Sequence, residues 1–93
     1  MKFEWDKFKN ALNIQNHKVS FEEACEVFED PMHISKLDYR FNYFKERWIT
    51  LGSTSHYKII VVSHMLFNDN NEEIIRIISA RKANSKEVKI YEK

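Results

Sequence analysis

Positively charged residues at the end of an apolar run are the first sign of chemistry in this sequence. Arg81 and Lys82 follow a run of isoleucines, and that run itself carries Arg76. A guanidinium group meets phosphate oxygens with two parallel N–H donors and stays charged at any cellular pH. Arg47, in an earlier segment of strand character, adds another cation. The pattern fits a phosphate-binding surface, but taken by itself it favours a solvated run of charges.

His64 interrupts a second apolar run in the same way. If the turn between the two runs centres on Asn70, a hairpin pairs positions that sum to about 140 and places His64 opposite Arg76. A shift of one residue would pair His64 with Ile77 and separate it from the arginine. Two polar residues facing water on an amphipathic sheet would give the same spacing.

Arginines and a histidine suffice to cleave RNA without a metal. In that reaction a 2′-hydroxyl attacks its own phosphate, cations stabilise the charge of the phosphorane, and a His or Glu moves protons. Glu46, beside Arg47, is either a base with its cation or half of a surface ion pair.

Other chemistries find little support in the sequence. The four histidines lie far apart and Cys25 is isolated, so we expect no metal site and no cofactor. A single glycine, Gly52, leaves no phosphate loop. We expect Cys25 to pack as a small hydrophobic residue.

Two helices are expected to come early. Asp6 is a good N-cap for a first helix that fades near Asn16. Ser20 and Glu23 form a capping box for a second helix, which ends at Asp30–Pro31. The apolar residues that recur at helical spacing in the first helix are Phe8, Leu12 and Ala11.

Most of the remaining chain reads as strands. The expected elements are a short strand at Phe3–Trp5, a weak strand plus loop within Met32–Phe44, strands at Trp48–Gly52, Lys58–Phe67 and Glu73–Arg81, a turn at Asn68–Asn71, and a helix capped by Asn84 or Ser85. The sequence therefore predicts one α+β domain over residues 1–93. It would contain two N-terminal helices, an antiparallel meander of about four strands and a short C-terminal helix, with the helices on one face of the sheet.

Charge is unevenly distributed although the formal net charge is only +1. Residues 3–31 contain seven acids, whereas residues 74–93 hold six bases against two acids. The acidic N-terminus does not resemble a signal peptide, and no later segment is long and apolar enough to span a membrane. We expect a cytoplasmic protein without a membrane partner.

An ordered series of short segments runs through nearly the whole chain. The segments are Phe3–Lys7, Asn16–His17, Val19–Ala24, Val27–Phe28, Asp30–Pro31, Glu46–Arg47, Gly52 and Arg76–Ala83, with Glu87 and Tyr91. In this order they resemble the BrnT toxins. The resemblance implies a RelE-like fold, a bacterial type II toxin–antitoxin system, and ribonuclease activity that arrests translation. It also implies a BrnA-type antitoxin, through which alone the complex would contact operator DNA.

The resemblance and the residue chemistry together give a candidate site. The expected catalytic residues are His17, Glu46, Arg47, His64, Arg76 and Arg81, and the expected RNA-binding residues are Lys7, Lys82, Lys86 and Tyr91. The substrate would be RNA, free or on the ribosome. A non-catalytic binding module that acts with its antitoxin in promoter autoregulation is the alternative.

Two segments depart from the family pattern. The family usually reads Lys-His-Gly-Val where this chain has Asn16–Val19, so Lys18 stands where a glycine is expected. The tract Tyr39–Phe44 is unusually aromatic. Its rings either stack on RNA bases or pack against the sheet, and we favour packing.

Overall fold

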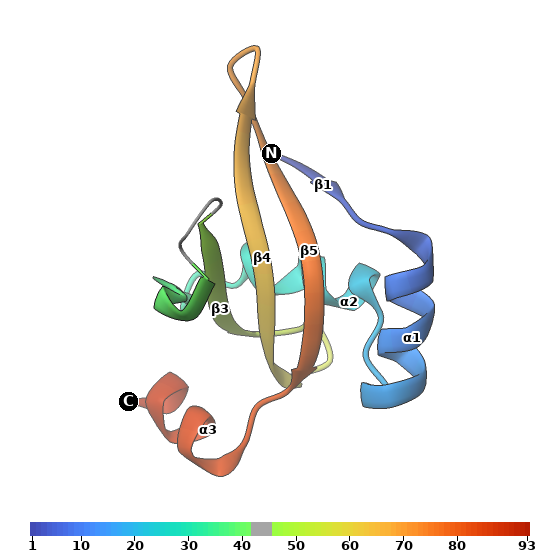
Figure 1. The fold of residues 1–93 in the computed structure, drawn as a ribbon. Coiled ribbons are helices and arrows are strands. Elements are labelled where there is room, and N and C mark those ends of the chain that lie inside the picture. Colours follow the sequence, from blue (N-terminus) through green and yellow to red (C-terminus); the bar gives the residue numbers. More distant parts are fainter. Residues whose placement is uncertain (42–45) are drawn as a thin grey trace.

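A computed structural model describes residues 1–41 and 46–93 of the chain. Its strands form one five-stranded sheet in the order β1-β5-β4-β3-β2 (Figure 1). The strands are β1 (Lys2–Glu4), β2 (Ile34–Leu37), β3 (Arg47–Ser53), β4 (Ile59–Asp69) and β5 (Glu72–Lys82). The helices are α1 (Lys7–His17), α2 (Phe21–Cys25) and α3 (Ser85–Glu92), with 3-10 turns η1 (Glu26–Glu29) and η2 (Tyr39–Phe41).

The predicted antiparallel meander is confirmed for β2 to β5, which pair in sequence order. Asn70 and Asn71 both have positive φ, 50° and 68°, as a two-residue turn between twisted strands requires. The sheet is mixed rather than purely antiparallel, because β1 adds to β5 in the parallel direction. The α+β class is confirmed.

The predicted helix caps are also present. The carboxylate of Asp6 accepts the amides of Phe8 and Lys9, and Ser20 forms its capping box with Glu23. Asn84 caps α3. At the other end of α1, Lys18 adopts a left-handed conformation with φ 60°. A glycine would adopt this conformation without strain. Lys18, which stands where the family pattern has glycine, therefore destabilises the end of the helix.

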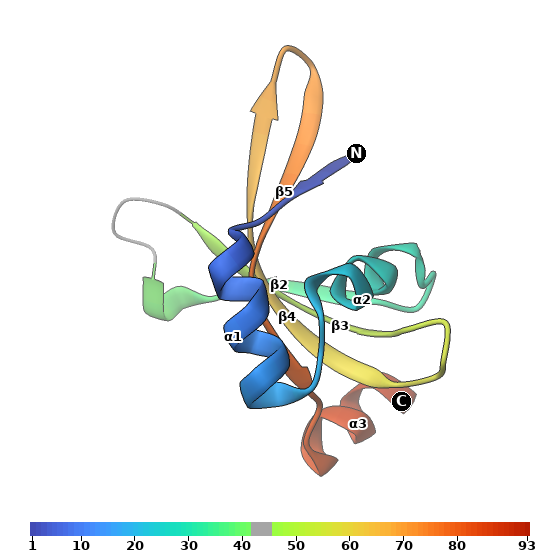
Figure 2. The ribbon, with the colours of Figure 1, turned by 90° about the vertical axis from the view of Figure 1, so that its right-hand side faces the viewer.

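The helices do not all lie on one face, contrary to the prediction. Figure 1 shows α2 behind the sheet and α1 beside β5, and Figure 2 shows α2 and η2 on opposite sides of the strands. α3 packs at the lower end of the other face. There Ile90 lines a hollow of about 100 Å³ with Ile34, Leu51 and Val61.

The core lies between the sheet and α2. Its buried residues are Val19, Phe21, Ala24, Val27, Ile60, Val62, Ile75, Ile77 and Ala80. Gly52 permits close packing here, since a Cβ at this position would lie 2.9 Å from the Cβ of Val27. Cys25 is half-buried, and burial raises the pKa of its thiol to about 11, so it is protonated at neutral pH.

α1 packs on the sheet with polar rather than apolar residues. The buried Asn13 side chain donates to the carbonyls of Val19 and Ala80, both at 2.8 Å, and accepts the amide of Ala80 at 3.1 Å. The side chain therefore makes hydrogen bonds to the backbone at the edge of β5, as a neighbouring strand would. Phe8 and Leu12, whose spacing indicated the helix, point into solvent and are 84% and 55% exposed.

A membrane-crossing segment would need a long apolar helix. None of the helices in the described part of the chain is long and apolar enough to cross a membrane.

Candidate functional site

The register between β4 and β5 determines which side chains share a face. His64 pairs with Ile77 and Met65 pairs with Arg76, so the positions sum to 141 and not to 140. The reason is the turn, which uses both Asn70 and Asn71 and therefore centres between them. A shift of one residue moves a side chain to the opposite face. The predicted pairing of His64 with Arg76 is thus wrong, and the two lie on opposite faces.

His64 is a core residue on the face that α2 covers. It is 2% exposed, and its ring meets that of Phe28 edge-on at a centroid distance of 4.9 Å. Its Nε2 lies 2.7 Å from the Thr50 hydroxyl, which in turn lies 2.7 Å from the hydroxyl of Ser35. Burial lowers the pKa of His64 to about 4, so the imidazole is neutral at physiological pH. Its position does not support the prediction that it moves protons beside Arg76.

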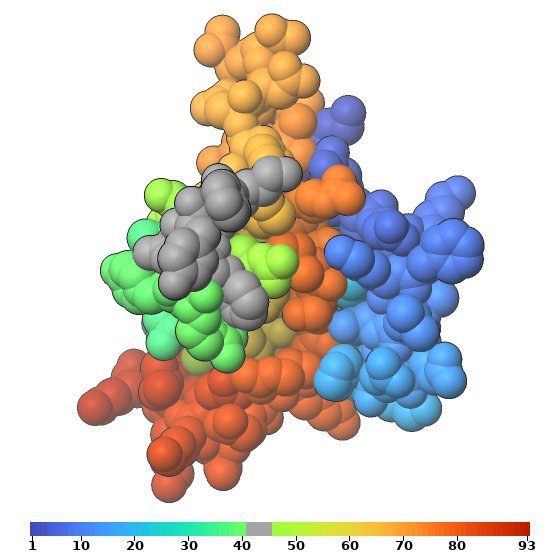
Figure 3. Space-filling model, in the orientation of Figure 1, coloured from blue at the N-terminus to red at the C-terminus, as the bar shows by residue number. Residues whose placement is uncertain are grey.

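The opposite face of the sheet carries the arginines. Arg47, Met65 and Arg76 pair in one row across β3, β4 and β5. Arg81 pairs with Val61, which pairs with Leu51, so it shares that face further down β5. Figure 3 shows this surface as a hollow in which β5 runs between α1 and η2, with α3 at its lower end.

Two further cations join this surface. Lys36 pairs with Ile49 and therefore points to the same side as Arg47. Arg40, in η2, interacts electrostatically with Arg81. We call the set Lys36, Arg40, Arg47, Arg76 and Arg81 the basic face.

Carboxylates orient the guanidinium groups of the basic face. Arg81 donates from Nη1 and Nη2 to the two oxygens of Glu87 at 2.8 and 2.9 Å. The Nη1 of Arg76 donates to Glu4 at 2.8 Å. Both arginine side chains remain accessible, at 45% and 43% exposed. The hydrogen bonds from Arg81 lower the pKa of the Glu87 carboxyl, which keeps the pair ionised.

Arg40 is held in a similar way. It donates from Nε and Nη2 to the two carboxylate oxygens of Asp38, both at 2.9 Å. These bonds lower the pKa of the buried Asp38 carboxyl. The amide of Asp38 donates to the carbonyl of Arg47 at 2.7 Å, which ties η2 to the start of β3.

Of the predicted catalytic residues, the structure brings Arg47, Arg76 and Arg81 to one face. Glu46 is exposed and immediately precedes Arg47 at the start of β3. His17 lies in the last turn of α1 and is exposed. It is not part of the row that Arg47 and Arg76 form.

The predicted RNA-binding residues are scattered. Lys7 starts α1, and Lys86 is exposed on α3. Lys82 pairs with the core residue Ile60 and so points away from the basic face. The hydroxyl of Tyr91 donates to Asp30 at 2.5 Å in an acidic cleft beside η1.

Sequence reasoning missed Lys36, Arg40 and the carboxylates of Glu4 and Asp38, whereas Glu87 was named only as a residue that carries the family resemblance. The alternation of Ile34, Ser35, Lys36 and Leu37 could have placed Lys36 on an exposed face. Arg40 had no comparable signal, because a short 3-10 turn has no periodicity. Tyr39 is 76% exposed, so the preference for packing is wrong at that residue. Tyr43 and Phe44 lie outside the described residues.

Within residues 1–41 and 46–93, no three His, Cys, Asp or Glu side chains gather closely enough to hold a metal ion. The arrangement instead offers several cations over a shallow hollow, three of them paired with the carboxylates of Glu4, Asp38 and Glu87. Such a surface can bind a phosphodiester and stabilise additional negative charge on it.

Comparisons with known proteins identify the family of this chain. The sequence model of the family described as "Ribonuclease toxin, BrnT, of type II toxin-antitoxin system" matches residues 5–87. The crystal structure of the Brucella abortus ribonuclease toxin BrnT superposes with a TM-score of 0.63 at 27% sequence identity. The match covers 91% of this chain and 99% of that chain. The search of curated proteins gave no match. The chain belongs to the BrnT family of ribonuclease toxins of type II toxin–antitoxin systems.

Proposed function

We propose that this protein is a metal-independent endoribonuclease that cuts RNA on its basic face and thereby inhibits translation. The observation that carries the proposal is the placement of Arg47 and Arg76 in one row across the sheet, with Arg81 on the same face. Membership of a family of ribonuclease toxins supports it. We further propose that a BrnA-type antitoxin neutralises the activity and that the complex contacts operator DNA through that antitoxin.

The proposed reaction needs charge stabilisation and proton transfer. Arg76 and Arg81 bind the non-bridging oxygens of the scissile phosphate while Arg47 assists. The 2′-hydroxyl attacks phosphorus, the bond from phosphorus to the 5′-oxygen breaks, and the products are a 2′,3′-cyclic phosphate and a 5′-hydroxyl. The cations stabilise the phosphorane, whose negative charge exceeds that of the substrate.

Glu46 is the residue that best fits the role of base among those predicted. It is exposed and precedes Arg47 in the chain, whereas His64 is buried on the face opposite to the arginines. Glu46 accepts the proton of the 2′-hydroxyl, and water supplies a proton to the departing 5′-oxygen.

Glu4 and Glu87 have a different part in this proposal. They hold Arg76 and Arg81 in place before RNA arrives. A phosphate that binds must share or replace these carboxylates, so we expect modest affinity for free RNA that falls with added salt.

The test is cleavage of a short labelled RNA by the purified protein in the presence of EDTA. We expect cyclic phosphate ends, no cleavage of a substrate with a 2′-deoxy nucleotide at the cut site, and a rate about 100-fold lower for Arg76→Ala. Products with 3′-hydroxyl ends would contradict the mechanism. A wild-type protein that leaves RNA intact, alone and with ribosomes, would favour the non-catalytic binding module.

A further inference from the structure

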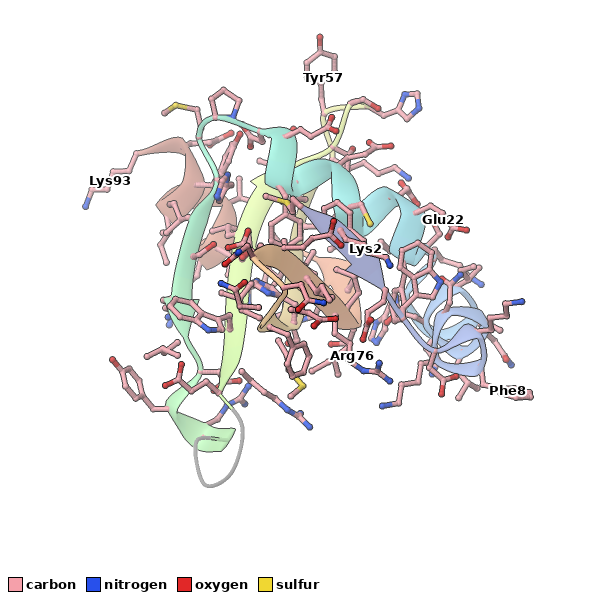
Figure 4. The ribbon with its side chains drawn as sticks, turned by 90° about the horizontal axis from the view of Figure 1, so that it is seen from above. Lys2, Phe8, Glu22, Tyr57, Arg76 and Lys93 are labelled. Carbon is pink, nitrogen blue, oxygen red and sulfur yellow. The ribbon has the colours of Figure 1, made fainter. Side chains whose placement is uncertain are left out.

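The outward side of α1 carries two large apolar residues, Phe8 and Leu12, although the helix needs no apolar residues there. Asn10 and Asn13 form the side that faces the protein, and Asn10 also accepts the amide of Phe21 at 2.8 Å. Phe8 and Leu12 lie one turn apart on roughly the opposite side of the helix. Figure 4 shows Phe8 pointing away from the body of the molecule. Two large apolar side chains are therefore exposed where the fold gains nothing from them.

The surroundings of these side chains are cationic. Lys7 and Lys9 flank the apolar stripe and are exposed, and α1 contains no acidic residue. The nearby carboxylates are already engaged. Asp6 accepts the first amides of the helix, and Glu22 accepts the side chain of Asn10 at 3.2 Å.

No element covers this side of the helix in the described part of the chain. Figure 2 shows α1 nearest to the viewer, with the sheet behind it. We define the outer face of α1 by Phe8, Leu12 and the flanking Lys7 and Lys9. An apolar stripe of this kind with a charged rim is typical of a protein-docking surface.

We propose that the outer face of α1 is a docking site for an acidic amphipathic helix of the antitoxin. This rests on the chain acting as the toxin of a toxin–antitoxin pair, as proposed above. Phe8 and Leu12 insert between apolar residues spaced three and four apart on the partner helix. Asp or Glu residues on both sides of that helix meet Lys7 and Lys9.

A second copy of this chain fits the same surface poorly. A twofold interface places the same patch on both partners. Two α1 helices would bring the lysines of one copy against those of the other, with no acidic residue in either helix to offset them. Charge complementarity therefore favours an acidic partner.

Phe8 and Leu12 are not residues of the basic face, so substitutions of these two test docking separately from RNA cleavage. We expect Phe8→Glu and Leu12→Glu each to weaken binding to the product of the antitoxin gene beside the toxin gene by about 30-fold or more, as loss of an interface anchor does. Calorimetry on the full-length purified proteins measures the affinity. Met32→Glu is the matched control, because Met32 is 63% exposed and lies outside α1. Circular dichroism and RNA cleavage should remain at wild-type level in all three variants.

Reversal of the lysine charges tests the docking site independently of its apolar residues. The double variant Lys7→Glu, Lys9→Glu should weaken antitoxin binding about tenfold or more and make the remaining affinity less dependent on salt. Substitution of the surface lysines has little effect on folding, so this variant keeps the test valid if Phe8→Glu does not fold.

Three outcomes would overturn the proposal. Wild-type affinity for the antitoxin in the α1 variants would show that α1 is not the docking site. A toxin dimer that Phe8→Glu dissociates, with antitoxin affinity unchanged, would assign the face to a second copy. Binding of the toxin to phosphatidylglycerol vesicles that Phe8→Glu abolishes, again with antitoxin affinity unchanged, would assign it to a membrane surface. A wild-type protein that does not cleave RNA would contradict the proposed activity and leave the docking result intact.

Discussion

The buried His64 should make the stability of this protein depend on pH above the range in which its carboxylates titrate. The imidazole is 2% exposed, and burial lowers its pKa from 6.5 to about 4. As the pH falls below 6.5, the unfolded chain binds a proton that the folded protein does not bind until about pH 4. The stability that His64 contributes as a neutral residue is therefore present above pH 6.5 and is lost as the pH falls towards 4.

The size of the fall in stability follows from the shift in the pKa of His64. Each pKa unit corresponds to about 1.4 kcal/mol, so the free energy of unfolding should fall by about 2 to 3 kcal/mol between pH 6.5 and pH 4.5. Carboxylates such as Asp38 and Glu87, whose pKa values are lowered by hydrogen bonds from Arg40 and Arg81, add their own losses at lower pH.

Urea unfolding followed by tryptophan fluorescence at several pH values measures this dependence. His64→Gln should be less stable at pH 7, because the substitution disturbs the packing against Phe28, but it should lose the slope between pH 6.5 and 4.5. His56→Gln, at an exposed loop residue, should keep the wild-type slope. A wild-type protein with constant stability over this range, or a His64→Gln variant with the wild-type slope, would refute the reasoning.

Three further substitutions test the packing. Asn13→Ala removes three hydrogen bonds to buried backbone groups and should lower the free energy of unfolding by about 3 kcal/mol; Asn16→Ala, at an exposed position of the same helix, should change it by less than about 1 kcal/mol. Gly52→Ala places a methyl group 2.9 Å from the Cβ of Val27 and should cost about 1 to 3 kcal/mol, so a neutral result in urea unfolding would disprove the close contact. Lys18→Gly relieves the left-handed residue at the end of α1 and should stabilise the protein by about 0.5 to 1 kcal/mol; a lower melting temperature would contradict this.

The elements could be predicted from the sequence, but the face on which His64 lies could not. The prediction depended on the centre of the turn between β4 and β5, and Asn68–Asn71 offers several centres. Both central residues adopt positive φ, which asparagine tolerates at either position. One residue of ambiguity was enough to reverse the relative face of the side chains between the turn and the β-bulge at Ser63/His64, where the register shifts again.

The spacing of apolar residues also did not predict which side of α1 faces the sheet. Phe8 and Leu12 revealed the helix, and in a helix that packs through apolar contacts they would face the core. Here Asn13 faces the sheet instead, because the edge of β5 at Ala80 needs hydrogen-bond partners that an apolar residue cannot provide. Only the tertiary structure shows that need.

The candidate site was predicted in part. Arg47, Arg76 and Arg81 were recognised because they are charged residues within or at the end of segments of strand character, and they do share a face. Lys36 and Arg40 come from β2 and η2. Their place on this face depends on the pairing of β2 with β3 and on the position of η2 near Arg81, which no local sequence pattern encodes.

The neighbours Arg81 and Lys82 offer the most direct test of the basic face. They are adjacent cations on β5, but the register places Arg81 on the basic face and Lys82 on the opposite one. The measurement is the single-turnover rate of RNA cleavage by Arg81→Ala and Lys82→Ala, with folding checked by circular dichroism. We expect the Arg81→Ala rate to fall about 100-fold and the Lys82→Ala rate to stay within about twofold of wild type. Equal losses in the two variants, or full activity in Arg81→Ala, would contradict an RNA-cleaving site on this face.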